Sequence, residues 1–134
     1  MARRKIGVIG GGFVGSTTAQ RLAEKELGDV VLVDIVEGMP QGKALDLSQA
    51  APVCGYDSCV IGANDYAPLA GAELVIITAG MPRKPGMDRS DLLKINGEIQ
   101  QKVVSGIMEY APEATLVIVS NPLDVMCFVA HQVS

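Results

Sequence analysis

The sequence predicts an α/β fold in which residues 1–134 form one domain, a doubly wound parallel sheet with helices on both faces. Three observations lead to this prediction. Short apolar runs alternate with segments of helical periodicity, which favours parallel strands joined by right-handed crossovers. Turn residues bound the apolar runs. With two Phe, three Tyr and no Trp, aliphatic side chains must fill the core, as in sheets covered by helices.

Five apolar runs are expected to form the strands. Several are apolar at consecutive positions, which is typical of strands buried on both faces. The expected strands cover residues 6–9, 30–33, 59–61, 74–78 and 116–119.

Helices are expected at residues 13–25 and 90–110, and a third helical pattern begins near residue 122. The Pro- and Gly-containing segment 81–88 is expected to be a mobile loop. The last helical pattern reaches the end of the sequence without a stop signal, whereas folds of this kind usually finish on a further strand. We therefore expect the sheet to lack its last strand.

Composition excludes several classes of function. The formal net charge of −4 gives no electrostatic reason to expect nucleic acid as a partner. No apolar run approaches the ~18 residues that span a bilayer, so no membrane is expected. Cys54, Cys59 and Cys127 have no metal-ligand spacing, so we expect no metal, reduced thiols and a cytoplasmic protein.

A glycine-rich turn directly follows the first expected strand and opens the first helix. It matches G-x-G-x-x-G, with Gly10 for the tight turn, Gly12 for approach of a pyrophosphate and Gly15 for close helix packing. Free N–H groups at the helix N-terminus favour phosphate binding. The turn predicts a Rossmann-type dinucleotide site whose cofactor-binding residues are Gly10, Gly11, Gly12, Phe13, Val14 and Gly15.

Asp34 ends the second expected strand, where a carboxylate accepts hydrogen bonds from both ribose hydroxyls of adenosine. Its charge repels a 2′-phosphate, so we expect NAD and not NADP. The alternative is a strand-end cap or a solvated acid. A P-loop is excluded because Ser16 stands where Lys is required. No Tyr has a Lys four residues later, which argues against a Tyr-Lys reductase.

Two further groups stand after expected strands, on the ligand side of the sheet. Arg83 and Arg89 lie on the 81–88 loop and directly after it, and two guanidinium groups there suit a dianion. From their spacing alone, surface charges are the simpler interpretation. Asn121 either caps the last helix, with Pro122 in its first turn, or presents its amide to the crevice, and the cap is the simpler interpretation.

Five motifs occur together in one order: residues 10–15, Asp34-Ile35, residues 42–47, residues 79–87 and Ser120-Asn121-Pro122. The resemblance that they carry extends over essentially the whole chain. In this combination the sequence resembles malate dehydrogenases of the lactate-dehydrogenase-like family. The resemblance implies an NAD-dependent oxidoreductase of the tricarboxylic acid cycle, which interconverts malate and oxaloacetate by hydride transfer. It also implies a homo-oligomer, a dimer or tetramer, in the full-length protein.

The resemblance implies a role for each matching residue. Arg83 matches the arginine that binds the distal carboxylate, where lactate enzymes carry Gln, and Arg89 matches the arginine that polarises the reacting carbonyl. Asn121 matches an asparagine that contacts substrate and nicotinamide, and the bond to Pro122 is expected to be cis. The remaining cofactor-binding positions are Asn96, Val119 and Ser120.

The resemblance implies that the family's C-terminal substrate domain, with its proton-transfer histidine, is absent from this chain and lies beyond residue 134. His131, the only histidine, stands in an apolar helical pattern and is expected to be structural or at the surface. Without a base the chain is expected to bind NAD but to turn malate over negligibly. Two alternatives remain: a non-catalytic NAD sensor, which has no need of Arg83 and Arg89, and a lactate-type dehydrogenase, which Arg83 opposes.

Overall fold

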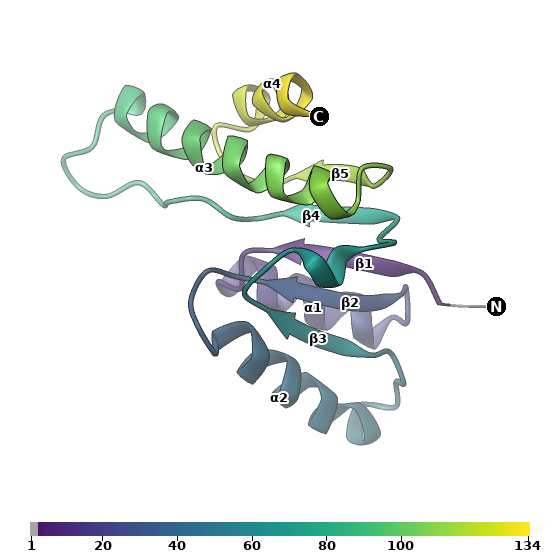
Figure 1. The fold of residues 1–134 in the computed structure, drawn as a ribbon. Helices are drawn as coiled ribbons and strands as arrows, with labels where there is room; N and C mark the ends of the chain where they lie inside the picture. Colours follow the sequence, from purple (N-terminus) through teal and green to yellow (C-terminus); the bar gives the residue numbers. More distant parts are fainter. Residues whose placement is uncertain (1–2) are drawn as a thin grey trace.

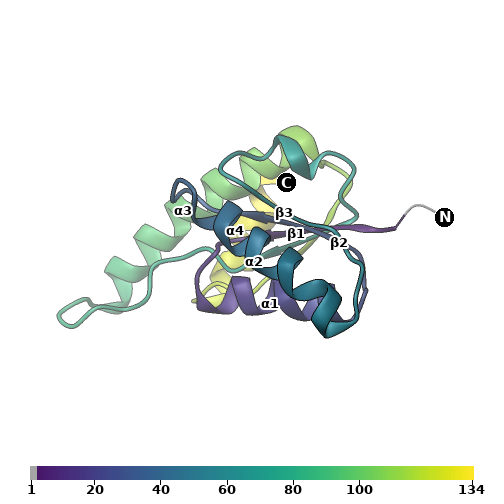
Figure 2. The same ribbon diagram turned by 90° about the horizontal axis from the view of Figure 1, so that it is seen from below.

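The computed structural model describes residues 3–134 as one parallel sheet with helices on both faces (Figures 1 and 2). Within these residues the sheet has five strands, in the order β3-β2-β1-β4-β5. The elements, in chain order, are β1 (Lys5–Ile9), α1 (Phe13–Glu24), β2 (Asp29–Val33), α2 (Met39–Cys54), β3 (Val60–Ala63), the 3₁₀ turn η1 (Ala67–Leu69), β4 (Leu74–Ile77), α3 (Arg89–Tyr110), β5 (Thr115–Ile118) and α4 (Leu123–Val133).

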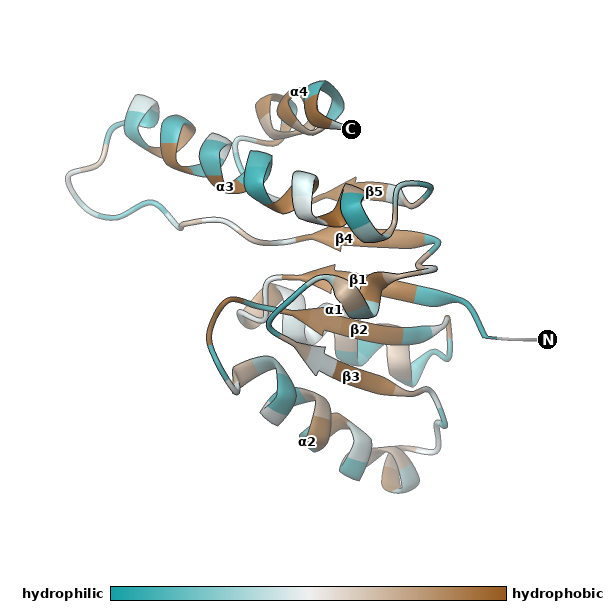
Figure 3. Cartoon of the chain, in the orientation of Figure 1, coloured by the Kyte–Doolittle hydropathy of each residue, from teal (hydrophilic) through white to brown (hydrophobic). Residues whose placement is uncertain are grey.

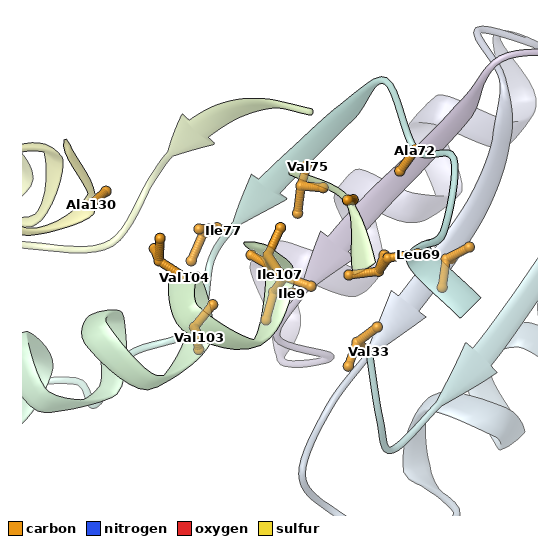
Figure 4. Close-up of a cluster of buried hydrophobic side chains, with 12 residues drawn as sticks. Ile9, Val33, Leu69, Ala72, Val75, Ile77, Val103, Val104, Ile107 and Ala130 are labelled. Atoms are coloured by element: carbon orange, nitrogen blue, oxygen red, sulfur yellow. The ribbon is translucent and has the colours of Figure 1, made fainter. Parts of the chain in front are cut away.

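Consecutive apolar residues in the strands pack into two separate hydrophobic cores, one on each face of the sheet. Val8 and Leu32 face α1 and α2, whereas Ile9, Val33 and Ile77 face η1 and α3. Figure 4 shows the second core, in which α3 side chains pack on β4 and β1. Hydropathy colouring marks the central strands as almost continuously apolar (Figure 3). Burial on both faces is confirmed for β1 and β2, whereas Ile61 of β3 and Val117 of β5 are exposed.

The order of the strands places the candidate site. β1 pairs with β2 on one side and with β4 on the other, all parallel, so their carboxyl ends lie at one edge of the sheet. The chain leaves β1 toward β2 and β3, and later leaves β4 toward β5, so the direction of winding reverses between β1 and β4. A crevice forms at such a reversal, beyond the carboxyl ends of the strands.

The sequence-based expectations missed one helix. The expected strands and the expected helices at 13–25 and 90–110 agree with the structure to within one or two residues, but α2 was not expected. Its apolar periodicity is weak, and it contains Pro52 near its end. Pro40 in its first turn, a favoured position for proline, is the signal that could have revealed it.

Two expectations from composition concern the cysteines and the possibility of membrane-spanning helices. Cys54, Cys59 and Cys127 are free and exposed. Among residues 3–134, none of the helices combines the length and the apolar character that crossing a membrane requires.

Replacing Gln100 with Leu is expected to stabilise the fold. Gln100 on α3 is fully buried, and neither atom of its side-chain amide has a hydrogen-bond partner within residues 3–134. A buried polar group without a partner costs about 1–3 kcal/mol, and Leu has a similar volume. The midpoint of urea unfolding should therefore rise. A lower midpoint for Gln100→Leu than for the unmodified chain would contradict this prediction.

Candidate functional site

A cleft of about 630 Å³ opens at the carboxyl ends of β1, β2 and β4. It is lined by the glycine-rich turn, the residues that follow β2, and the start of the loop that follows β4. These lining residues are Ile9, Gly10, Gly12, Phe13, Val14, Gly15, Val33, Asp34, Ile35, Val36, Asn64, Tyr66, Thr78, Ala79, Gly80, Met81, Pro82, Ile99 and Val103. The structure thus brings the predicted turn and Asp34 together in one cleft.

Gly10 and Gly15 shape the turn between β1 and α1. Gly10 has a φ of +100°, which only glycine adopts readily, and its N–H donates to the carbonyl of Val33 at 2.8 Å. A Cβ on Gly15 would lie 1.7 Å from the Gly10 carbonyl oxygen and 2.7 Å from Thr78 Oγ1. The tight turn and the close helix packing expected from the sequence are both present.

Gly12 is the residue whose surroundings point to a ligand. Its backbone is extended, and a Cβ there would meet nothing within 4 Å in the described part of the chain. It is the N-cap of α1, and within residues 3–134 no side chain caps the helix and no acidic residue lies in its first turn. Protein packing therefore does not require glycine here. The open N–H groups and the helix dipole suit an anion such as a diphosphate.

The carboxylate of Asp34 is oriented by two backbone N–H groups. Oδ2 accepts from Gly11 at 2.6 Å, and Oδ1 accepts from Val36 at 2.9 Å. Asp34 thus links the glycine-rich turn to the loop after β2, so the strand-end interpretation is correct in part. Each oxygen keeps a second lone pair, and the side chain is only half-buried, so both remain available to ribose hydroxyls.

The cleft residues Asn64 and Tyr66 were not expected from the sequence. Asn64 and Tyr66 follow β3, and both line the cleft together with the glycine-rich turn. Tyr66 packs against α3 because Gly106 leaves room for its ring, which a Cβ at Gly106 would meet at 2.5 Å. Burial raises the pKa of Tyr66, so its phenol stays neutral at physiological pH. A tyrosine after a short strand carries no distinctive sequence signal.

Neither of the two predicted arginines lines the cleft, whose lining follows the loop after β4 only as far as Pro82. The segment between β4 and α3 projects from the body of the molecule (Figure 1). Arg83 is exposed and donates from Nε to the carbonyl of Met87 at 3.2 Å. Arg89 is exposed as the first residue of α3, whose N-terminus is held by a capping box between Asp88 and Asp91. Both guanidinium groups are therefore accessible to a dianion.

The capping role expected for Asn121 is wrong. The N-cap of α4 is Pro122, and in the described chain no side chain caps this helix. Asn121 lies one residue too early for its amide to reach the first-turn N–H groups. The bond between Asn121 and Pro122 is cis, which confirms the expectation from the resemblance. Asn121 itself is exposed and is not among the residues that line the cleft.

Ser120 and Val119 connect β5 to β4. The hydroxyl of Ser120, a buried residue, donates to the carbonyls of Ala79 at 2.6 Å and Ile77 at 3.3 Å. The N–H of Val119 donates to the carbonyl of Ile77 at 2.9 Å, and its side chain is exposed. In the structure Ser120 acts as a link between strand ends, and its cofactor contact remains a prediction.

Asn96 joins the projecting loop to the Asn121 turn. Its Oδ1 accepts from the N–H of Met81 at 2.7 Å, and its Nδ2 donates to the carbonyls of Asn121 at 2.7 Å and Met81 at 3.3 Å. Asn96 is buried, so its amide is largely used within the protein. A contact between Asn96 and the cofactor likewise remains a prediction.

Replacing Asn96 with Ala is expected to destabilise the protein by about 1–3 kcal/mol, because backbone groups of Met81 and Asn121 lose buried partners. The free energy of urea unfolding measures this loss. Hydrogen exchange at the Met81 amide should also become faster. Asn96→Asp keeps the acceptor for that amide but sets a buried carboxylate oxygen against two carbonyls, so it should lose at least as much stability as Asn96→Ala. Equal unfolding energies for the unmodified chain and Asn96→Ala would contradict the prediction.

His131 lies outside the cleft. It is exposed on α4 and lines a separate cavity of about 440 Å³ together with Met108, Leu116 and Ile118. This agrees with the expectation of a structural or surface histidine. The only histidine of the chain is thus not placed to exchange a proton with a ligand in the cleft.

Curated relatives share this sequence over nearly all of the chain. The malate dehydrogenase of Geobacter sulfurreducens is 54% identical over 134 residues, which are 100% of this chain and 42% of the relative. The malate dehydrogenase of Dehalococcoides mccartyi is 58% identical over 130 residues, which are 97% of this chain and again 42% of the relative. The chain therefore spans about two fifths of the length of these relatives, 42% in each.

Solved structures share the fold. The apo malate dehydrogenase of Picrophilus torridus has a TM-score of 0.95 and 44% identity, over 99% of this chain and 43% of that one. The lactate dehydrogenase of Cryptosporidium parvum, solved with lactic acid and NAD, has a TM-score of 0.93 and 47% identity, over 100% of this chain and 42% of that one. Residues 4–134 match the model of one domain family, and the chain accordingly belongs to the lactate/malate dehydrogenase NAD-binding domain family.

Proposed function

We propose that the chain is the cofactor-binding part of an NAD-dependent malate dehydrogenase, and that NAD lies in the cleft at the carboxyl ends of the strands. The observation that carries the proposal is the uncapped N-terminus of α1 at Gly12, which stands in one cleft with the oriented carboxylate of Asp34. The diphosphate is held by the N–H groups of the helix, and the adenosine ribose by Asp34.

The substrate is proposed to be malate or oxaloacetate. When bound, NAD would accept the hydride that leaves malate. Arg83 binds the distal carboxylate, Arg89 polarises the reacting carbonyl, and Asn121 orients substrate and nicotinamide with its amide. The accessibility of Arg83 and Arg89 and the unused amide of Asn121 support these roles. Both malate and lactate dehydrogenases are similar to this chain, so the preference for a dicarboxylate rests on Arg83.

The proton of the malate hydroxyl must leave as the hydride does. A guanidinium group stays protonated and cannot accept it. Because His131 lies outside the cleft, we expect the chain alone to bind NAD without appreciable turnover. We propose further that the full-length protein is a soluble cytoplasmic enzyme that forms dimers or tetramers.

Calorimetric titration with NAD and NADP tests cofactor binding, and loss of NADH absorbance with oxaloacetate tests turnover. We expect NAD to bind more tightly than NADP and turnover to be negligible. If NAD does not bind, the proposed function is wrong. Turnover of oxaloacetate by the purified chain would show that the inference about the missing base is wrong, while leaving cofactor binding intact.

The choice of substrate is tested by Arg83→Gln in a longer polypeptide that carries this chain and turns over oxaloacetate. A charge-assisted hydrogen bond contributes about 1.5–3 kcal/mol, and each 1.4 kcal/mol changes a ratio about tenfold. We therefore expect kcat/KM for oxaloacetate to fall about 10- to 100-fold, with no comparable fall for pyruvate. A parallel loss for both substrates would contradict the assignment of Arg83.

A further inference from the structure

Asn64 connects the end of β3 to the loop after β2. Its Nδ2 donates to the carbonyl of Asp34 at 2.7 Å and to the carbonyl of Val36 at 2.9 Å. Its Oδ1 accepts from Nε2 of Gln41, on α2, at 2.6 Å. The two carbonyls fix the orientation of the amide, because a flipped amide would set its oxygen against both of them.

These contacts hold the segment that carries the proposed adenosine site. The two carbonyls flank Ile35, whose side chain is exposed and lines the cleft. The Val36 N–H also donates to Oδ1 of Asp34, so the backbone that Asn64 holds is the same backbone that orients the carboxylate. Asn64, from the segment after β3, thus holds the backbone on both sides of Ile35.

We propose that Asn64 is a positioning residue for the adenosine end of NAD and that it acts through Asp34. Both amide hydrogens of Asn64 are used on backbone carbonyls, and its oxygen is used on Gln41, so it has no donor to spare for a ligand. This inference rests on the proposed binding of NAD in the cleft.

The exposure of Asn64 separates this role from a contribution to stability. Its hydrogen bonds lie at the surface, where water replaces them readily when the side chain is removed. Removing the Asn64 side chain instead lowers the affinity for NAD, because the loop after β2 is then no longer held and must be ordered when NAD binds. Substitution of Asn64 should therefore lower both the affinity for NAD and the selectivity for the adenosine ribose that Asp34 provides.

The test compares Asn64→Ala and Asn64→Asp with the unmodified 134-residue chain. Calorimetry gives the dissociation constants of NAD and of its analogue without the 2′-hydroxyl of the adenosine ribose. Ordering one side chain or loop segment changes affinity by roughly 3- to 10-fold. For Asn64→Ala we expect NAD affinity to fall by that factor and the preference for NAD over the analogue to fall about threefold or more. Asn64→Asp should lose more, because its carboxylate faces two carbonyls.

Asp65→Ala is the matched control. Asp65 is the next residue, is also exposed, and its side chain accepts from the N–H of Ala67 away from the loop after β2. It should leave the preference for NAD over the analogue unchanged. If the unmodified chain binds NAD but the Asn64 variants keep both affinity and preference, the inference is wrong. It is equally wrong if affinity falls with the melting temperature while the preference stays constant. If the unmodified chain binds no NAD, the proposed function itself fails.

Discussion

Replacing Gly12 with Ala is expected to weaken NAD binding about 10- to 100-fold and to change the free energy of unfolding by less than about 1 kcal/mol. A Cβ at this position meets open space within residues 3–134, and the backbone is extended, so the protein itself accommodates the methyl group. The small gain from a less flexible unfolded chain offsets the poorer N-cap. The same methyl group occupies the space where the diphosphate approaches the N–H groups of α1.

Gly12→Ser sharpens this test. Serine is a strong N-cap, so its hydroxyl accepts from the first-turn N–H groups that the diphosphate needs. Stability should therefore hold or rise while NAD affinity falls. Gly42→Ala is the control, because Gly42 lies in α2 and a Cβ there would meet nothing within 4 Å among residues 3–134. It should leave NAD affinity unchanged. Full NAD affinity in Gly12→Ser would contradict the assignment of the diphosphate site.

Replacing Gly15 with Ala is expected to destabilise the fold by about 3 kcal/mol or more, at the upper end of the cost of overpacking. The new Cβ would lie 1.7 Å from the Gly10 carbonyl oxygen and 2.7 Å from Thr78 Oγ1. The closer atom belongs to the backbone of the turn and cannot rotate away, so α1 must move from the sheet. Urea unfolding measures the loss, and NAD affinity should fall with it because the turn loses its shape.

Gly97→Ala provides the comparison for Gly15. Gly97 lies inside α3, and a Cβ there would meet nothing within 4 Å in the described chain. Alanine at an open helical position should stabilise by about 0.5–1 kcal/mol. If Gly15→Ala lowers the free energy of unfolding and Gly97→Ala raises it, then the close approach of neighbouring atoms, and not the loss of glycine as such, explains why glycine is needed at position 15. A Gly15→Ala protein as stable as the unmodified chain would show that the turn is not as tightly packed as described.

The sheet could be predicted from the sequence because its central strands are apolar at consecutive positions. Val8 and Ile9 face opposite layers and are both buried, so the run has no polar alternation and has the pattern of a strand with two covered faces. The roles of Gly10 and Gly15 were predictable for a related reason. A positive φ and a missing Cβ are local requirements that leave glycine at fixed spacing.

Other features depend on contacts between distant parts of the chain, and the sequence did not reveal these. Asn64 donates to the carbonyls of Asp34 and Val36 in the loop after β2, and Ser120 donates to the carbonyl of Ile77 at the end of β4. α2 was missed because only Pro40, Ala44 and Leu47 of its residues are buried, which leaves little apolar periodicity. The expected cap at Asn121 was wrong because Pro122 occupies the N-cap position itself.

The proposed function depends above all on a diphosphate that binds the bare N-terminus of α1 while Asp34 holds the adjoining ribose. Titration of the ¹⁵N-labelled chain with NAD, followed residue by residue in amide spectra, locates the bound cofactor. We predict large shifts at the amides of Phe13 and Val14, and at those of Gly11 and Val36, which donate to Asp34. Saturable shifts confined to other parts of the chain, or no shifts at all, would contradict this placement of NAD.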